Sequence, residues 1–525
     1  MTSVARLVGD RLRAAGVRYV FGHPGGEVVD LIEGFRQAGL DFVLTRHETS
    51  AGFIAEAMAT STGVPGVCLA TLGPGATNLV TGVAHCYLDR APVLAFTGQL
   101  PADRYEITTH QKLDLRALYA PITKWQARLT ARTAASVVDR ALRVALAPRK
   151  GPVYIEVPSD VPHKEASDVA RQPAPVEPEP ALDPGSEREA AALLRASTRP
   201  IVIVGMDANE PRVVAPLRAF AEAWRLPVLD LPKAKGVFRE DHPLFLGTLE
   251  GLGTAKLFEL IDSADLVLMV GVDPVEFDRD WTATAKVVHI GALANDDRYY
   301  PSDVEIVSPV PDTLEQLRSG AQPKWPQDEI ASFREDFRAY VSPARDGLTP
   351  QQVLAELRAA LPEDALVTCD VGYNKAVSAQ CWTALAPRTF FVSNGLSSMG
   401  YGLPAAIGLK LAHPDRQVAC VLGDGGFAMT MAELETAVRL KLAITVVVLA
   451  DDALSQIKAG QERRKFPVTG TTFGELDYGE VAHGFGIKAC DARTPEACGD
   501  ASRNPSSDRP ILLVARIDPS AYRLA

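Results

Sequence analysis

The sequence predicts an α/β protein made of three doubly wound domains, each built on a parallel sheet. Its 525 residues are about three and a half times a typical domain of roughly 150 residues. Short apolar runs alternate with segments of helical period along the whole chain, a pattern typical of parallel strands joined by helices. A stretch rich in proline and acidic residues at 164–186 and a polar stretch at 319–348 interrupt this pattern. The two interruptions divide it into three parts.

The first domain is expected at residues 1–165 and begins with an amphipathic helix. Arginines within residues 1–16 would also suit a transit peptide, but Asp10 interrupts them and a strand follows at once, which favours the helix. The expected strands are 17–21, 41–44, 66–70, 92–97 and 153–157. Residues 166–186 are then expected to form a semi-extended linker.

The middle domain is expected at residues 187–325 and the last domain at 345–525. The expected strands of the middle domain are 201–204, 228–231, 266–270, 287–290 and 304–307. Those of the last domain are 366–369, 390–392, 418–422, 444–449 and 511–515. Strands and helices follow one another in a similar rhythm in the first and last domains, so we expect these two to be structurally related.

Composition and charge exclude several classes of partner. The chain is 47% hydrophobic and 23% charged, and its net charge is −11 without a Lys/Arg-rich run. We therefore predict a soluble protein that binds neither nucleic acid nor a membrane surface. The longest apolar runs are far shorter than the roughly 20 residues of a membrane helix. Seven cysteines are scattered without C-x-x-C spacing and are expected to be reduced, which favours a cytoplasmic protein.

The most informative segment is 418–452, where a glycine-rich stretch follows an expected buried strand. This strand is expected to end at Leu422, and the next one at Asp451, with a helix at about 430–439 between them. Such a connection lies at the carboxyl edge of a parallel sheet, where ligands usually bind. Glycines allow the backbone to approach a phosphate closely. The glycines of this stretch are Gly423, Gly425 and Gly426.

Two kinds of cofactor could use this segment. Gly423-x-Gly425-x-x-Ala428 fits the dinucleotide fingerprint, with Asp451 where a ribose-binding acid is expected, which would suit an NAD-linked dehydrogenase. However, Asp424 puts a carboxylate inside the loop, and two anions about 4 Å apart repel unless a cation bridges them. Mg²⁺ held by Asp424, Asp451 and diphosphate oxygens removes this conflict. A glycine turn with two surface acids is the structural alternative.

This spacing resembles the motif of thiamine diphosphate-dependent enzymes. Gly-Asp-Gly at 423–425 is followed, 27 residues after Asp424, by a polar residue, and nearly the whole chain resembles the acetolactate synthase large subunit and related 2-oxo acid decarboxylases and carboligases. The resemblance implies thiamine diphosphate and Mg²⁺ as cofactors, with Asp424, Asp451 and the Ala453 carbonyl as metal ligands. The family motif usually closes with two asparagines, whereas this chain has Ala450 and Asp451.

In the first domain, residues 46–48 (RHE) resemble the family's R-H-E segment. The resemblance implies that the carboxyl of Glu48 binds N1′ of the aminopyrimidine and promotes the tautomer that removes the C2 proton. Without the resemblance, an acid at a helix N-terminus is better explained by the helix dipole.

Three further loops of the first domain match the family in order. They are 21–26 (FGHPGG), 73–78 (GPGATN) and 97–99 (TGQ). The resemblance places Pro24, Gly25 and Asn78 at the cofactor or substrate.

In the last domain, residues 393–400 (SNGLSSMG) resemble the segment that holds the aminopyrimidine. The resemblance implies that Met399 supports the bent cofactor and that the Ser397 carbonyl accepts its hydrogen bond. A role as core filler is the ordinary alternative for Met399. Tyr373 and Asn374 stand where the family places diphosphate ligands, often Gln-His in synthases.

Residues 110–114 (HQKLD) occupy a loop where acetolactate synthases carry Phe-Gln-Glu. Gln111 matches and is expected to be catalytic, together with Gly25 and Glu48. His110 could exchange protons with a covalent intermediate at neutral pH, and so could His23, although an exposed histidine is the more common outcome.

The middle domain departs from the flavin-binding synthases. Residues 271–277 (GVDPVEF) stand where those enzymes have an Arg-Phe-Asp-Asp type run, and 246–254 lack their Gly-Met-His-Gly-like segment. These departures make FAD doubtful. Residues 454–465 lack the Trp-containing helix of those enzymes, so the choice of substrate is expected to differ.

The resemblance implies decarboxylation of a 2-oxo acid and carboligation of the resulting carbanion/enamine, as in acetolactate synthase. Simple decarboxylation to an aldehyde is one alternative, and a thiamine diphosphate-binding protein without chemistry is another. The family builds its site between two chains, so a homodimer or homotetramer is expected.

Overall fold

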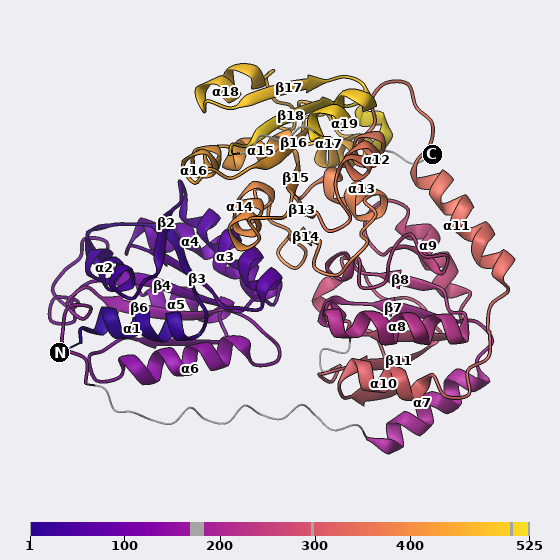
Figure 1. The fold of residues 1–525 in the computed structure, drawn as a ribbon, viewed down its shortest axis with the longest axis horizontal. Helices are drawn as coiled ribbons and strands as arrows, with labels where there is room; N and C mark the ends of the chain where they lie inside the picture. Colours follow the sequence, from indigo (N-terminus) through magenta and orange to yellow (C-terminus); the bar gives the residue numbers. More distant parts are fainter. Residues whose placement is uncertain (1, 168–182, 296–298, 504–507, 523–525) are drawn as a thin grey trace.

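The computed structural model describes residues 2–167, 183–295, 299–503 and 508–522. In this part of the chain three six-stranded sheets are present, and neighbouring strands run parallel (Figure 1). The predicted fold class, three α/β units with parallel sheets, is confirmed. No described helix is long and apolar enough to cross a membrane. Most of the predicted linker, residues 168–182, lies outside the described residues.

The first sheet has the strand order β2-β1-β3-β4-β6-β5. Its strands are β1 (Tyr19–His23), β2 (Asp41–Leu44), β3 (Gly66–Ala70), β4 (Val93–Gln99), β5 (Trp125–Arg128) and β6 (Val153–Pro158). The helices around it are α1 (Val4–Ala14), η1 (Gly26–Val28), α2 (Val29–Gln37), α3 (Glu48–Thr62), α4 (Pro74–Leu88), α5 (Leu115–Tyr119), η2 (Ala120–Ile122) and α6 (Ala134–Leu146). α3 begins directly after His47, whose ring accepts a hydrogen bond from the Thr49 N–H.

The middle sheet has the order β12-β11-β10-β7-β8-β9, which is the Rossmann order 3-2-1-4-5-6 read from its other edge. Its strands are β7 (Pro200–Val204), β8 (Val228–Asp230), β9 (Phe245–Thr248), β10 (Leu266–Val270), β11 (Lys286–Gly291) and β12 (Val304–Val307). Its helices are α7 (Pro184–Ala196), η3 (Met206–Ala208), α8 (Pro211–Trp224), η4 (Pro232–Ala234), α9 (Thr254–Asp262), η5 (Pro274–Glu276) and α10 (Val310–Leu317). α11 (Gln327–Val341) leads from there to the last sheet (Figure 1).

The last sheet has the order β14-β13-β15-β16-β18-β17, the same order by position as the first sheet. Its strands are β13 (Leu366–Cys369), β14 (Phe390–Val392), β15 (Val418–Gly423), β16 (Ile444–Ala450), β17 (Lys488–Ala492) and β18 (Ile511–Arg516). Its helices are α12 (Pro350–Ala360), α13 (Tyr373–Cys381), α14 (Gly402–Ala412), α15 (Asp424–Thr430), α16 (Glu433–Arg439), α17 (Ser455–Arg463), α18 (Tyr478–Gly484), α19 (Pro495–Arg503) and η6 (Pro519–Tyr522). The expected relationship between the first and last domains is therefore visible in their strand order.

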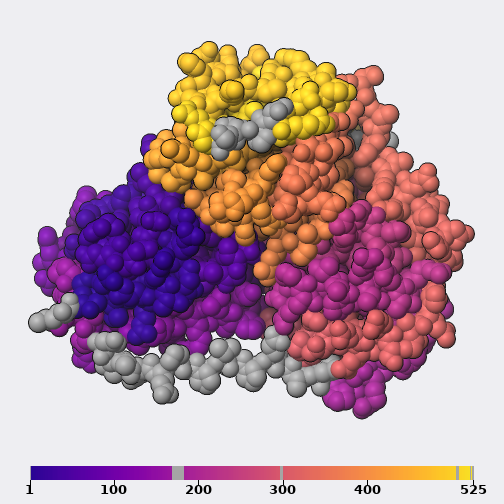
Figure 2. Space-filling model, in the orientation of Figure 1, coloured from indigo at the N-terminus to yellow at the C-terminus, as the bar shows by residue number. Residues whose placement is uncertain are grey.

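The last sheet shares a hydrophobic core with each of the other two. Successive residues of its strands point to opposite faces. Leu366 and Cys420 pack in a core with α3 and α4 of the first sheet, whereas Val367 and Val421 pack in a core with the middle sheet. The space-filling view shows this last lobe, orange to yellow, seated on the other two (Figure 2). Burial of both faces explains why its strands are almost continuously apolar.

Each sheet has one strand that was not expected from the sequence, and it is an edge strand in all three. These strands are β5, β9 and β17. β5 is only half-buried and β17 is largely exposed, so their residues lack the apolar run that marks the central strands. β9 is buried but short, and it contains Gly247.

The glycine-rich stretch after β15 is helical rather than a turn. α15 begins at Asp424 and ends at Thr430, and α16 follows it. The prediction of a single helix that begins at about residue 430 is therefore wrong, because the helical region begins at Asp424. Asp424 suits the first turn because a carboxylate there interacts favourably with the helix dipole. Gly426 serves close packing, since a Cβ there would lie 2.5 Å from Oδ2 of Asp370.

Candidate active site

The first group of predicted residues lies at the carboxyl ends of β1, β2 and β3. Glu48 is the first residue of α3, and its side chain is buried, with 8% of the residue exposed. Nδ2 of Asn78, in α4, donates a hydrogen bond of 3.1 Å to Oε2 of Glu48. The structure therefore brings Glu48 and Asn78 together. Because this partner is a neutral amide, the hydrogen bond leaves the Glu48 carboxyl available to a further ligand.

A second carboxylate, which the sequence analysis did not single out, lies on the same edge of the sheet as Glu48. Oγ1 of Thr71 donates a hydrogen bond of 2.7 Å to Oε2 of Glu27, and Thr71 also packs under Gly25 and Gly75. A Cβ on Gly75 would lie 3.3 Å from Oε1 of Glu48. Glu27 directly follows the predicted H-P-G-G turn, so its position in that motif was the signal that could have identified it.

Gln111 lies on the same edge of the sheet. Its backbone has φ of 55°, and its side chain covers Gly73, where a Cβ would lie 3.1 Å from Cβ of Gln111. Gln111, His110 and Pro24 are exposed. Nδ1 of His23 lies 2.9 Å from the carbonyl oxygen of Thr45, so its ring is tied to the strand end.

The second group of predicted residues lies at the carboxyl ends of β13, β15 and β16. Oδ2 of Asp424 accepts hydrogen bonds from the backbone N–H groups of Asp451 (3.1 Å) and Asp452 (2.6 Å). Asp452 has a positive φ of 55°, which turns the chain so that both N–H groups face Asp424. Oδ2 of Asp451 accepts a hydrogen bond of 2.5 Å from Ser455, and Ala453 is buried.

The electrostatics of this group fit a divalent cation. Burial raises the pKa of Asp424. Burial, together with the charge of Asp424, also raises the pKa of Asp451 to about 6. Within the described ranges neither carboxylate has a lysine, arginine or histidine at ion-pair distance, and no cluster of three His, Cys, Asp or Glu side chains could hold a metal. Two crowded, unpaired carboxylates with a nearby main-chain carbonyl are oxygen donors that Mg²⁺ accepts, provided that a ligand completes its shell.

Glycines and Asp370 shape the backbone beside these carboxylates. Asp370, also absent from the sequence predictions, is fully buried, and burial raises its pKa to about 7. Its carboxylate accepts hydrogen bonds from the N–H groups of Val371 (2.6 Å) and Gly400 (2.9 Å). It therefore joins β13 to the 393–400 segment directly beneath Gly426.

Tyr373 and Asn374 open α13 next to this backbone. Nδ2 of Asn374 donates a hydrogen bond of 2.7 Å to the carbonyl of Asp370, and a Cβ on Gly423 would lie 3.4 Å from Oδ1 of Asn374. The Tyr373 ring stacks on Tyr522, with centroids 4.9 Å apart. Asn374 therefore faces the start of α15, whereas the ring of Tyr373 packs against Tyr522 instead.

The 393–400 segment lies against the same glycines. A Cβ on Gly425 would lie 3.2 Å from Cε of Met399, so this side chain covers the start of α15. Ser397 is exposed and has a positive φ of 53°, a conformation that non-glycine residues rarely adopt. Strained backbone of this kind clusters at functional sites.

The crevice of the Rossmann-ordered middle sheet is filled by side chains of this chain. Oε2 of Glu276 accepts a hydrogen bond of 2.7 Å from the N–H of Met206, at the end of β7 where a dinucleotide diphosphate would bind. Nε of Arg90 lies 2.8 Å from Oδ2 of Asp273 in the same place. The remaining void is about 10 Å³, room for about one water. Glu276 and the Arg90–Asp273 pair thus occupy the place where the diphosphate of a dinucleotide would lie in a sheet of this order.

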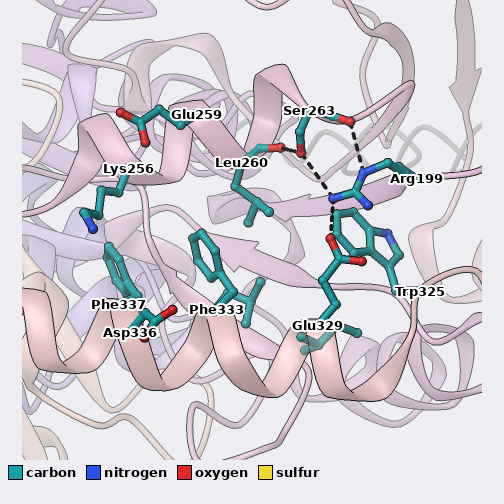
Figure 3. A pocket seen from close by; sticks show the side chains of 12 residues that line it. Arg199, Lys256, Glu259, Leu260, Ser263, Trp325, Glu329, Phe333, Asp336 and Phe337 are labelled. Carbon is teal, nitrogen blue, oxygen red and sulfur yellow. Dashed lines mark hydrogen bonds and ion pairs between the residues drawn. The ribbon is translucent and has the colours of Figure 1, made fainter.

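A larger cavity of about 320 Å³ lies between α9 and α11 (Figure 3). Two of its charged groups pair with each other, since Nη2 of Arg199 lies 2.7 Å from Oε1 of Glu329. The guanidinium of Arg199 also covers the Trp325 ring at 3.9 Å from its centroid. No predicted site residue lines this cavity.

Three family models match successive parts of the chain. The thiamine pyrophosphate enzyme N-terminal TPP binding domain matches residues 2–118, and the central domain of these enzymes matches residues 188–317. The C-terminal TPP binding domain matches residues 370–515. The two TPP binding matches contain the two groups of residues described above.

The chain is also similar to curated proteins along nearly its full length. Acetolactate synthase isozyme 1 large subunit of Escherichia coli (strain K12) is 34% identical, over 97% of this chain and 92% of the relative. Acetolactate synthase of Bacillus subtilis (strain 168) is 30% identical, over 98% and 93%. Acetolactate synthase of Arthrospira platensis is 35% identical, over 92% and 88%.

Proposed function

The chain belongs to the thiamine pyrophosphate (thiamine diphosphate) enzyme family, and we propose that it decarboxylates a 2-oxo acid and ligates the product to a second carbonyl compound. The observation that carries the proposal is the pair of carboxylate groups on two sheets of the same topology. Glu48, whose hydrogen-bond partner is neutral, stands at the edge of the first sheet, and Asp424 with Asp451 stands at the same edge of the last sheet. When bound, thiamine diphosphate supplies the nucleophilic carbon and the electron sink for the decarboxylation.

Glu48 would hold and return a proton at the aminopyrimidine ring. Its carboxylate is buried, so it is screened from solvent, and Asn78 orients it with a neutral hydrogen bond. General acid–base catalysis needs a side chain positioned to exchange a proton with the reacting group, here a buried carboxylate next to a ring nitrogen. Gln111, on Gly73, and Gly25, on Thr71, would line the substrate side of the same edge.

Asp424, Asp451 and the Ala453 carbonyl would hold Mg²⁺. The raised pKa of both carboxylates means that a bound cation stabilises their ionised forms. Gly423 would leave room for the diphosphate beside Asn374, whereas Gly425 and Gly426 let Met399 and Asp370 pack against the start of α15.

The middle domain would work without FAD. Glu276 takes the place that a diphosphate would need, so the purified protein should show no visible flavin absorbance. A stoichiometric flavin spectrum would contradict this part of the proposal.

Each half of the site would be completed by a second copy of the chain. Large apolar side chains are exposed near both halves, and large exposed apolar patches typically mark interaction sites. Near Gln111 these are Ile107 (80% exposed) and Leu113 (42%). After Asp424 and Asp451 they are Met429 (63%), Ile457 (55%), Phe466 (58%), Val468 (42%) and Phe473 (42%). A homodimer or homotetramer that faces one first sheet with a partner's last sheet would bury them.

Product analysis tests the proposed reaction. Purified protein with Mg²⁺ and thiamine diphosphate is incubated with pyruvate and larger 2-oxo acids, and the products are identified by mass spectrometry. We expect CO₂ release and a product with a new carbon–carbon bond, and neither without the cofactors. An aldehyde as the sole product would replace carboligation by simple decarboxylation. Cofactor binding without any CO₂ release would remove the catalytic proposal altogether.

A further inference from the structure

Five buried side chains meet where the three domains join, and we call them the junction cluster. They are Glu56 of α3, His85 of α4, Asp89 directly after α4, Lys233 of η4 and Tyr401 directly before α14. Each is at most 9% exposed. Charged groups are rarely buried this deeply unless they pair with one another.

The charges of the junction cluster balance. Nζ of Lys233 lies 2.8 Å from Oδ1 of Asp89 and 3.4 Å from Oε1 of Glu56. Nδ1 of His85 lies 3.0 Å from Oδ2 of Asp89. Burial acts to lower the pKa of His85, but the two carboxylates outweigh it and raise this pKa to about 9. At neutral pH two cations therefore face two carboxylates, and Tyr401 donates a hydrogen bond of 2.8 Å to Glu56.

Asp89 also binds three consecutive backbone N–H groups of the last domain. Its Oδ1 accepts hydrogen bonds from Asn394 (3.0 Å) and Gly395 (3.4 Å), and its Oδ2 accepts one from Leu396 (3.4 Å). Successive N–H groups that converge in this way form a typical anion-binding concavity. Here the anion is a side chain of the first domain.

The same segment is fixed on its other side. Oγ of Ser393 accepts a hydrogen bond of 3.0 Å from the N–H of Ser398, and it lies 3.1 Å from Nδ1 of His85. These contacts fix the residues on both sides of Ser397 in the sequence, and the positive φ of Ser397 is a strained backbone conformation. Strained backbone persists only where its surroundings determine it, and here those surroundings include the junction cluster.

We propose that Asp89 is a positioning residue for the cofactor, because it fixes the 393–400 segment that presents the Ser397 carbonyl and Met399 to the aminopyrimidine. This inference rests on the proposed function, which assigns Ser397 and Met399 to that ring. Asp89 acts through the segment and does not itself touch the cofactor. Lys233 and His85 compensate its charge, so that the carboxylate stays ionised in the interior.

Two variants separate positioning from folding. Asp89→Asn keeps the size of the side chain but replaces one acceptor oxygen with an NH₂ group that faces N–H donors. It also leaves Lys233 with less compensation, which can destabilise the fold. The double variant Asp89→Asn/Lys233→Met removes one charge of each sign, so Glu56 and His85 remain balanced.

The test compares two ligands of the full-length apoprotein by titration calorimetry in the presence of Mg²⁺. Thiamine diphosphate needs both the diphosphate site and the 393–400 segment, whereas inorganic pyrophosphate needs only the former. We expect both variants to bind thiamine diphosphate about tenfold more weakly or worse, and pyrophosphate within about twofold of the wild type.

Glu240→Gln is the matched control. Glu240 is a buried carboxylate paired with a lysine, since its Oε1 lies 2.8 Å from Nζ of Lys235, and it accepts a hydrogen bond from the N–H of Ala384. No hydrogen bond or ion pair joins it to the 393–400 segment among the described residues. We expect this variant to bind both ligands like the wild type.

Equal weakening of both ligands in the Asp89 variants, or no weakening of either, would overturn the positioning role. A wild-type protein that binds pyrophosphate but not thiamine diphosphate would overturn the proposed function instead, and this outcome is visible before any variant is measured. Weakening of thiamine diphosphate by Glu240→Gln to the same extent would also remove the special role of Asp89.

Discussion

The first and last sheets share one strand order but carry different chemistry at the same edge. In the first sheet Glu48 has one neutral partner, Asn78. In the last sheet Asp424 and Asp451 crowd together, and their pKa values rise. The comparison teaches that the shared scaffold fixes where ligands bind, whereas the neighbours of each carboxylate decide its task. A carboxylate with a neutral partner suits proton transfer, and a crowded pair suits a cation.

The largest expected effect separates these two tasks. Glu48→Gln should lower kcat by roughly 10²–10⁴-fold, the usual contribution of a positioned acid or base, while thiamine diphosphate still binds. Asp424→Asn should instead weaken Mg²⁺ binding by roughly 10–100-fold or more, because a direct ligand matters at least as much as its supports. Steady-state kinetics and metal titration check the two effects. If both variants lost Mg²⁺ binding alike, the division of tasks would be wrong.

Mixing the two inactive variants tests whether the two edges meet between chains. If each site combines the first sheet of one chain with the last sheet of its partner, a mixed dimer of Glu48→Gln and Asp424→Asn contains one intact site. Unfolding and refolding the two chains together should then restore roughly a quarter of the wild-type activity, as random pairing of symmetric dimers gives. A mixture that stays inactive, although it exchanges subunits, would place each site within one chain.

Glycine substitutions compare the packing of the two edges. Gly426→Ala would put a Cβ 2.5 Å from Asp370, and Gly25→Ala would put one 2.4 Å from Thr71. Each should lower the free energy of unfolding by about 1–3 kcal/mol, the usual cost of overpacking. Gly484→Ala is the control, because no atom lies within 4 Å of its Cβ. Urea denaturation measures all three, and an unchanged Gly426→Ala would show that this glycine is not needed for close packing.

A smaller effect is expected from substitution of Glu27, at the carboxyl edge of the first sheet. Its carboxylate adds a second negative charge on the same edge as Glu48, which should repel an anionic 2-oxo acid. Glu27→Gln should therefore lower KM by about threefold, with less difference at high salt and little change in kcat. Glu33→Gln, on the exposed face of α2, is the matched control. An increase in KM would instead mean that Glu27 binds substrate.

The smallest effect is the pH dependence of stability that the junction cluster confers where the three domains join. The pKa of folded His85 is raised from 6.5 to about 9. Its contribution to stability is therefore fully present below pH 6.5 and is lost as pH rises through about 9. His85→Gln should lower the Tm by a few degrees at pH 6.5, and the two proteins should converge above pH 9. A Tm difference that is independent of pH would exclude a protonated His85.

The sequence predicts the central strands well because apolar runs directly reflect burial on both faces. The central strands β10 and β13 have the predicted bounds, whereas the edge strands β5 and β17 escape prediction because solvent replaces half of their environment. The start of α15 was misjudged because two glycines normally favour a turn. Here they allow contact with Asp370, a tertiary cause that local sequence cannot reveal.

The family resemblance identified Asp424 and Asp451 as candidates by their fixed spacing along the chain, and Glu48 by the RHE segment at 46–48. The junction cluster has no such spacing. Glu56, Lys233 and Tyr401 come from three domains, and only folding brings them within hydrogen-bond or ion-pair distance. Their pairing could therefore not be predicted from the sequence.

α3 and α14 hold equivalent places, each between the second and third strands of its sheet, and they pack directly against each other. A contact between equivalent elements is what two copies of one subunit make around a twofold axis. Here both partners belong to one polypeptide. The chain thus has the arrangement that would result if an ancestral gene for a self-pairing single-sheet protein had duplicated and fused. In that case the two halves would have been free to diverge, one toward the proposed proton transfer and the other toward the proposed metal binding.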